Sequence, residues 1–118
     1  MELSILSIAI LSVVALQHFG FMYLEMFLWE KPVGLKTFRM TPEVARLSAD
    51  LAKNQGLYNG FLAAGIVWSL ITGNVDASGY FLVCVAIAGM YGAYTVSKRI
   101  FYVQSCPAIL GLVTIYVL

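Results

Sequence analysis

The chain has 118 residues, of which 61% are hydrophobic and only 11% are charged, and its mean hydropathy is +0.88. A soluble domain carries about 25% charged residues, and one small core could not hide this much apolar surface. The composition therefore indicates an integral membrane protein rather than a soluble domain. The formal net charge of +1 gives no indication of a nucleic-acid partner.

Four hydrophobic segments follow one another along the chain. They cover residues 3–29, 56–72, 80–96 and 100–118. A helix that spans a bilayer needs about 20 residues, and none of the segments alternates as the strands of a membrane barrel do. We therefore predict an all-α fold, with residues 1–118 forming a single four-helix transmembrane bundle. The first segment has no basic start and no small-residue cleavage site, so we expect a retained membrane helix rather than a signal peptide.

The connections between the segments are marked by turn-forming residues. The stretch EKPVGLKTFRMTP, residues 30–42, contains two prolines and one glycine and is predicted to be a loop. Thr41, Pro42 and Glu43 have the pattern of a helix start, which predicts a long second helix that begins near Pro42 with a polar stretch. Pro107 is expected to kink or break the fourth segment. Cys84 and Cys106 are expected to be packed, reduced thiols rather than a disulfide or a metal site.

All seven basic residues fall in two of the three connections or beside them. They are Lys31, Lys36, Arg39, Arg46, Lys53, Lys98 and Arg99. Loops rich in Lys and Arg stay in the cytoplasm. The sequence therefore predicts a multi-pass protein of the cell membrane with cytoplasmic basic loops and with both termini facing outward.

The start of the second segment, AKNQGLYNGFLAAG at residues 52–65, combines polar and small residues. On a helix, Asn54, Gln55, Tyr58 and Asn59 fall within an arc of about 140°. Gly56 and Gly60, on another face of the helix, form a GxxxG pattern that lets a second helix approach closely. Polar groups in hydrocarbon need partners, so we expect this polar face to point into the bundle or into a wet cavity. Contacts that only hold helices together remain an equal alternative to a ligand site.

The first segment carries two ionisable residues, His18 and Glu25, seven positions apart. Ionisable groups inside membrane helices are costly and are candidates for function. For Glu25 the alternative is an interfacial carboxylate paired with a lysine, and for His18 it is a hydrogen bond to a neighbouring group. Because the chain has no second histidine, no histidine-rich zinc or haem site is expected. The two residues could instead form a proton-relay pair.

Further polar residues occur on the last two segments. Tyr91, Tyr94 and Lys98 lie on one stripe of the third segment, and Gln104 lies early in the fourth. The direction of each helix places most of these groups in the cytoplasmic half of the bilayer. The predicted ligand-binding residues are His18, Glu25, Asn54, Gln55, Tyr58, Asn59, Tyr91, Tyr94, Lys98 and Gln104.

Four stretches carry a resemblance to a known family: ALQHFGFMYLEMFLW, NQGLYNGFLAAG, AGMYGAYTV and VQSCPAIL. Together they resemble small bacterial four-helix membrane proteins grouped as domain of unknown function 1304. The resemblance implies the fold and a place in the bacterial inner membrane. It indicates no activity, and any cofactor is unknown. Members often have a glutamate before the histidine of the first helix. Gln17 stands there in this chain, which argues against a mechanism that needs a carboxylate beside His18.

A more distant likeness is to the membrane-associated eicosanoid and glutathione metabolism proteins. These also have four helices, outward termini and a polar second helix that holds ligand in a trimer. Where they carry an arginine one turn before an asparagine and an acid one turn after, this chain has Asp50 and Leu57 around Asn54. The glutathione motif is therefore absent, and the likeness is one of architecture.

Three hypotheses for function follow. The first, which the polar residues favour slightly over the other two, is a cytoplasm-facing polar pocket that binds or modifies an amphipathic small molecule or lipid. The second is a small oligomeric transporter or channel that uses Glu25 and His18 as coupling groups. The third is a structural or interaction subunit of the membrane. No phosphate loop, nucleophilic triad or metal-ligand spacing is present, so no enzymatic activity is assigned. A homo-oligomer is expected, because four short helices leave faces to bury.

Overall fold

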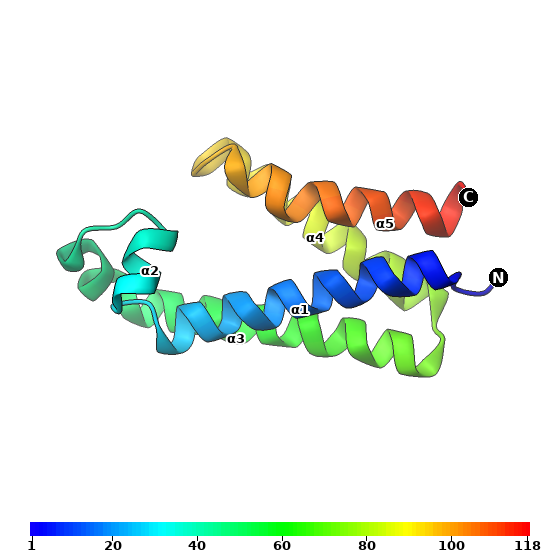
Figure 1. The fold of residues 1–118 in the computed structure, drawn as a ribbon, viewed down its shortest axis with the longest axis horizontal. Helices are drawn as coiled ribbons and strands as arrows, with labels where there is room; N and C mark the ends of the chain where they lie inside the picture. The colour runs from blue at the N-terminus through cyan, green and yellow to red at the C-terminus, as the bar shows by residue number, and fades with distance from the viewer. The chain divides into compact units, whose positions relative to one another are not determined.

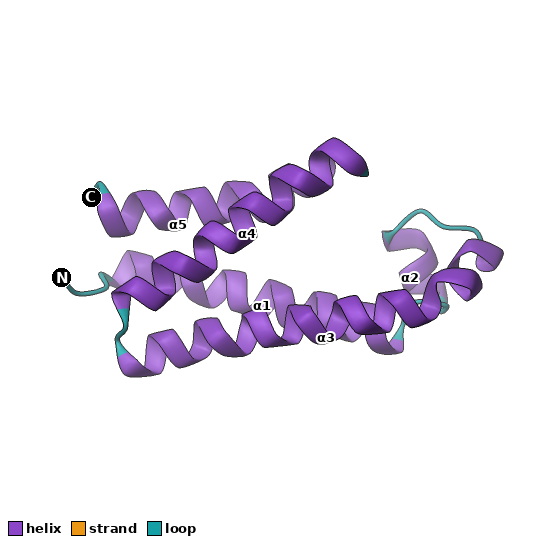
Figure 2. Ribbon diagram, turned by 180° about the vertical axis from the view of Figure 1, so that it is seen from behind, coloured by secondary structure: helices purple, strands orange, loops and turns teal.

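The computed structural model describes all 118 residues, and it is helical throughout with no strand (Figures 1 and 2). Its elements in chain order are α1 (Ile5–Phe27), α2 (Pro32–Thr37), α3 (Pro42–Thr72), α4 (Val75–Thr95), the π-helical segment η1 (Phe101–Ser105) and α5 (Cys106–Tyr116). The prediction of an all-α chain is confirmed. The long helix with a polar start begins at Pro42, as predicted.

The connection between α1 and α3 was predicted to be a loop, and this prediction is wrong, because residues 32–37 form α2. Pro32 stands in the first turn, where its fixed φ suits a helix and its missing N–H is not needed. Gly34 allows α2 to lie against the end of α1, since a Cβ there would lie 2.1 Å from the backbone oxygen of Leu28. The turn residues of this connection therefore start a short helix.

The start of α4 and the break in the fourth hydrophobic segment both have local causes. α4 begins at Val75 rather than near residue 80, because the side chain of Asn74 accepts a hydrogen bond from the N–H of Ala77 at 3.0 Å. In the fourth segment the expected break takes the form of η1, where the N–H of Cys106 bonds to the oxygen of Phe101 five residues earlier. Pro107 supplies no N–H to a regular helical ladder, and the wider π turn comes directly before it.

The chain divides into two compact units. Unit one comprises residues 1–15 and 64–118, and unit two comprises residues 16–63, so that α1 and α3 contribute to both. In unit one, α4 packs along η1 and α5. Both chain termini and the turn between α3 and α4 lie at the same end of this unit (Figures 1 and 2).

Unit one contains the apolar core. Its buried residues come from α1, α3, α4 and α5, and they are Leu11, Val14, Ala15, Ile66, Leu82, Val85, Ala86, Ala108 and Ile115. Buried hydroxyl groups join the helices around this core. The Ser7 hydroxyl donates to Thr114 at 2.9 Å, and the Ser78 hydroxyl donates to Ser69, also at 2.9 Å. Small hydroxyl side chains of this kind satisfy each other and let helices pack closely.

In unit two, α1 and α3 approach closely along small residues of α3. A Cβ at Gly56 would lie 2.6 Å from Cγ of Met26, and one at Gly60 would lie 2.6 Å from Sδ of Met22. The predicted role of the GxxxG pattern in close helix packing is thereby confirmed. At the end of α1, the indole N–H of Trp29 donates to the Ser48 hydroxyl at 3.1 Å.

Two helices, α1 with 23 residues and α4 with 21, are long and apolar enough to cross a membrane. Their most apolar stretches are only 28% and 33% buried within the chain. Large apolar side chains such as Ile5, Leu16 and Ile87 are exposed along them. The chain alone therefore leaves most of the apolar surface of both helices uncovered.

Candidate functional site

The candidate site is a hydrogen bond between two buried side chains of unit two, Glu25 of α1 and Asn59 of α3. The Nδ2 group of Asn59 donates to Oε1 of Glu25. Glu25 is 8% exposed and Asn59 is 9% exposed. We refer to these two residues as the Glu25–Asn59 pair.

The small residues of α3 position the Glu25–Asn59 pair. Gly60 follows Asn59 directly, and Gly56 stands one turn before it. A Cβ at Gly56 would lie only 3.1 Å from Cβ of Glu25. Because neither glycine carries a side chain, α1 comes close enough for the carboxyl group to meet the carboxamide.

The partner of the Glu25 carboxyl group is a neutral amide. An interfacial carboxylate paired with a lysine, which the sequence allowed, is not what the structure shows. The ion pair in this region joins Arg46 to Glu43 at 3.7 Å, and both side chains are largely exposed. The pair is therefore a buried acidic group held by a hydrogen bond and not by a salt bridge.

His18 is buried two turns before Glu25 on α1, with 1% of its surface exposed. Its ring meets the ring of Phe21 edge-on, with the centroids 5.2 Å apart, and it takes part in a further interaction. Seven helical residues rise about 10 Å. A proton that passes between His18 and Glu25 therefore needs water or another group between them.

The other polar residues of α3 do not point inward as predicted: Asn54, Gln55 and Tyr58 are exposed. The face of α3 that packs on α1 is the small-residue face. At about 100° per residue, Asn59 lies about 60° from Gly56 on the helical wheel, whereas Asn54 and Tyr58 lie about 160° from it. The angle between each polar residue and the GxxxG face on the helical wheel was the signal in the sequence that could have identified Asn59, rather than Asn54, Gln55 or Tyr58, as the buried residue.

The remaining predicted residues belong to unit one. Tyr91 and Tyr94 are exposed on α4, Lys98 is exposed in the connection that follows, and Gln104 is half-buried in η1. A single pocket made of all ten predicted residues stays a prediction. No group of three or more His, Cys, Asp and Glu residues could hold a metal ion, and Cys84 and Cys106 are free thiols.

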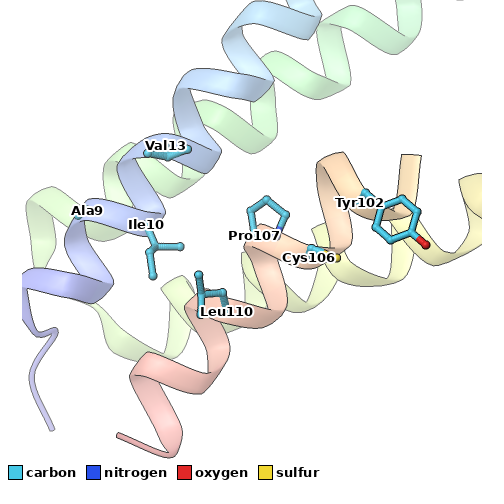
Figure 3. Close-up of a pocket in the computed structure, with 7 residues that line it drawn as sticks. All are labelled: Ala9, Ile10, Val13, Tyr102, Cys106, Pro107 and Leu110. Atoms are coloured by element: carbon cyan, nitrogen blue, oxygen red, sulfur yellow. The ribbon is translucent and has the colours of Figure 1, made fainter. Parts of the chain in front are cut away.

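Unit one has an apolar groove of about 410 Å³ that contains none of the predicted residues. It is lined by Ala9, Ile10, Val13, Tyr102, Cys106, Pro107 and Leu110. Figure 3 shows Ile10 of α1 and Leu110 of α5 pointing toward one another, while the hydroxyl group of Tyr102 points away from α1. The sequence had marked Cys106 as a thiol and Pro107 as a break in the helix, but no local pattern indicated that the seven residues line a groove.

Fold and site together define a small, all-helical and strongly apolar protein with a buried carboxyl–carboxamide pair between two helices. The chain belongs to the family described as "Protein of unknown function (DUF1304)", which matches residues 12–116. The resemblance stated from the sequence is thus confirmed. The likeness to the membrane-associated eicosanoid and glutathione metabolism proteins is not shown.

A curated relative supports the same assignment. The chain is 31% identical over 116 residues to the "Uncharacterized protein YpaA" of Lactococcus lactis subsp. lactis (strain IL1403). The match covers 95% of this chain and 98% of the relative. No solved structure matches the chain.

Proposed function

We propose that this protein is a multi-pass protein of the bacterial cell membrane and acts as a small proton-linked transporter or channel, with the Glu25–Asn59 pair as its functional centre. Four helical segments cross the bilayer in this proposal: α1, the apolar part of α3, α4, and η1 together with α5. Both termini face outward and the basic connections face the cytoplasm.

The lengths and surfaces of the helices support the membrane placement. α1 and α4 are about 34 and 31 Å long at about 1.5 Å per residue, and the hydrocarbon core of a bilayer is about 30 Å thick. A core helix of a soluble protein would be mostly covered by its own chain, whereas these two are only 28% and 33% buried. Because α1 also supplies Leu11, Val14 and Ala15 to the core, it is an integral part of the fold.

The observation that carries the functional proposal is the burial of Glu25 without a basic partner. A carboxyl group inside a membrane segment is costly to keep, and such groups mark ion and proton pathways. Its hydrogen bond to Asn59 comes from a neutral group, so the carboxyl group can take up or release a proton while its partner stays in place. His18, buried farther toward the outward end of the same helix, is a second group that can carry a proton.

Proton flux in liposomes tests this proposal. Purified protein is reconstituted with a trapped pH-sensitive dye, and an inward proton gradient is applied alone and with a panel of amino acids, carboxylates and monovalent cations. We expect flux above that of protein-free liposomes, and a loss of that excess in Glu25→Gln, which keeps the shape and hydrogen-bonding capacity of the side chain but cannot titrate. Glu30→Gln is the matched control because Glu30 is exposed, and it should behave as wild type. Equal flux in wild type and in Glu25→Gln would contradict the proposal.

A second candidate is the binding of an amphipathic small molecule or lipid, and the apolar groove of unit one favours it. Ligand sites have volumes of about 300–1,000 Å³, and the groove at about 410 Å³ falls within this range. Its apolar lining suits an acyl chain. Native mass spectrometry of protein taken from membranes would show a retained lipid mass, which Leu110→Trp should remove by filling the groove. An unchanged lipid mass in that variant would count against this candidate.

A further inference from the structure

The outer face of α3 carries a regular stripe of exposed residues in unit two. Their spacing is three and four residues in alternation, which is the heptad pattern of a helix that pairs with another helix. The stripe consists of Val44, Leu47, Leu51, Asn54, Tyr58 and Phe61. We call these residues the α3 stripe.

The α3 stripe lies opposite the face that packs on α1. Ala45, Ala49 and Ala52 of the inner face are buried, and the centre of the stripe is about 150° from that face around the helix. Leu47 is 70% exposed and Leu51 is 76% exposed. The chain itself therefore leaves these leucines uncovered.

Lipid does not account for the first half of the α3 stripe. α3 has 31 residues, so its length of about 46 Å exceeds the hydrocarbon core of about 30 Å by roughly three α-helical turns at its polar start. In that part the leucines alternate with charged residues, such as Arg46, Asp50 and Lys53. A stripe of large apolar side chains that extends out of the bilayer calls for cover by another protein helix.

We propose that the α3 stripe is the surface through which two copies of this chain pair, with their α3 helices parallel. The inference rests on the membrane placement proposed above, because insertion gives both copies the same direction and depth. Residues of the stripe then meet their own counterparts. Asn54 is the one carboxamide in an otherwise apolar and aromatic stripe, and a carboxamide can both donate to and accept from an identical group. A hydrogen bond between the two Asn54 side chains favours the register in which they meet.

The residues beside the α3 stripe complement each other in the same register. In heptad terms Asp50 stands at position g and Gln55 stands five residues later at position e, and these two positions face each other across a parallel pair. The carboxylate of Asp50 is an acceptor and the amide of Gln55 is a donor. This contact occurs twice by symmetry, so the flanks favour a second copy of this chain over an unrelated apolar helix. Pairing also gives a four-helix protomer the additional width that a transport pathway needs.

Cysteine cross-linking in isolated membranes tests the pairing. In full-length protein with Cys84→Ala and Cys106→Ala, single cysteines are placed on the stripe as Leu47→Cys and Asn54→Cys. The matched controls are Arg46→Cys and Lys53→Cys, which lie one residue earlier and outside the stripe. After mild oxidation we expect on the order of tenfold more covalent dimer at the two stripe positions, because a disulfide forms only when the Cβ atoms come within about 4.5 Å. Equal cross-linking at stripe and control positions, or none at either, would overturn the proposal.

A second test introduces a charge into the α3 stripe and measures the mass of the complex. Leu47→Glu should reduce the mass of the detergent-solubilised complex to that of one chain, while the control Arg46→Glu leaves it unchanged. Both positions are exposed, so neither variant disturbs the fold of the protomer. An unaltered complex mass in Leu47→Glu would count against pairing through the stripe. Whether the wild-type protein is recovered in the membrane fraction is measured separately. A protein that is found in membranes but does not pair contradicts only the pairing, whereas a protein that is absent from membranes contradicts the membrane placement.

Discussion

At the scale of single residues, the Glu25–Asn59 pair shows how one hydrogen bond makes a buried acid tolerable. A buried polar group without a hydrogen-bond partner destabilises the fold by its full desolvation free energy. Asn59 supplies an N–H donor to the carboxyl group without adding a second charge. The sequence identified Glu25 as a candidate because of its apolar neighbours. It offered four possible polar partners on α3, and only the packing of α1 against α3 selects Asn59.

Replacing Asn59 tests the strength of this bond. Asn59→Leu leaves the Glu25 carboxyl group buried without its donor and should lower the free energy of unfolding by about 1–3 kcal/mol. The double variant Glu25→Leu/Asn59→Leu removes both polar groups and should recover most of that loss. Denaturant unfolding of the detergent-solubilised protein, followed by circular dichroism, gives the comparison. Additive effects of the two substitutions would show that the side chains are not coupled.

At the scale of elements, α3 is a helix with two different faces. Its small residues bring α1 within contact, and its large residues on the other side remain exposed. The GxxxG pattern predicted the first face correctly. The sequence did not predict that Asn54, Gln55 and Tyr58 are exposed in the protomer, because a carboxamide in the sequence does not reveal which neighbour its face meets.

Two glycine-to-alanine substitutions should have opposite effects on stability. A Cβ at Gly56 would meet Met26, the Cβ of Glu25 and the backbone oxygen of Met22 at 2.6, 3.1 and 3.2 Å, so Gly56→Ala pushes α1 away and should destabilise by about 1–3 kcal/mol. A Cβ at Gly20 would meet nothing within 4 Å, so Gly20→Ala should stabilise by up to about 1 kcal/mol through helix propensity. Thermal unfolding of both variants in one detergent checks the signs. The close packing of α1 on α3 would be refuted if both variants were stabilised.

At the scale of the whole molecule, the composition and the exposed apolar surfaces of α1 and α4 are those of a protein surrounded by lipid. In unit one the termini and the turn between α3 and α4 share one end (Figures 1 and 2), as the predicted outward topology requires for these three points. The basic residues Lys98 and Arg99 stand at the far end of α4. This arrangement agrees with the rule that places basic loops in the cytoplasm.

Labelling of single cysteines tests this topology. In the background without native cysteines, Asp76→Cys lies at the start of α4 and Lys98→Cys lies beyond its end, and both positions are exposed. A membrane-impermeant maleimide should label Asp76→Cys in intact cells and should label Lys98→Cys only after the membrane is permeabilised. The reverse pattern would invert the topology, and equal labelling of both positions in intact cells would refute a membrane crossing by α4.

Composition and hydrophobic runs were enough to predict the helical fold. The pattern of Thr41, Pro42 and Glu43 predicted the start of α3, the GxxxG pattern predicted its close packing, and the resemblance of four stretches indicated the family. These features depend on residues that are neighbours along the chain or along one helix, so a local pattern specifies them. The α2 helix, the π turn before Pro107 and the partner of Glu25 each depend on contacts or hydrogen bonds whose outcome a local pattern leaves open. In AKNQGLYNGFLAAG the residue types were visible from the start, but only the approach of α1 decided that Asn59 is buried while Asn54, Gln55 and Tyr58 face outward, because a helix buries whichever face its neighbour can approach most closely.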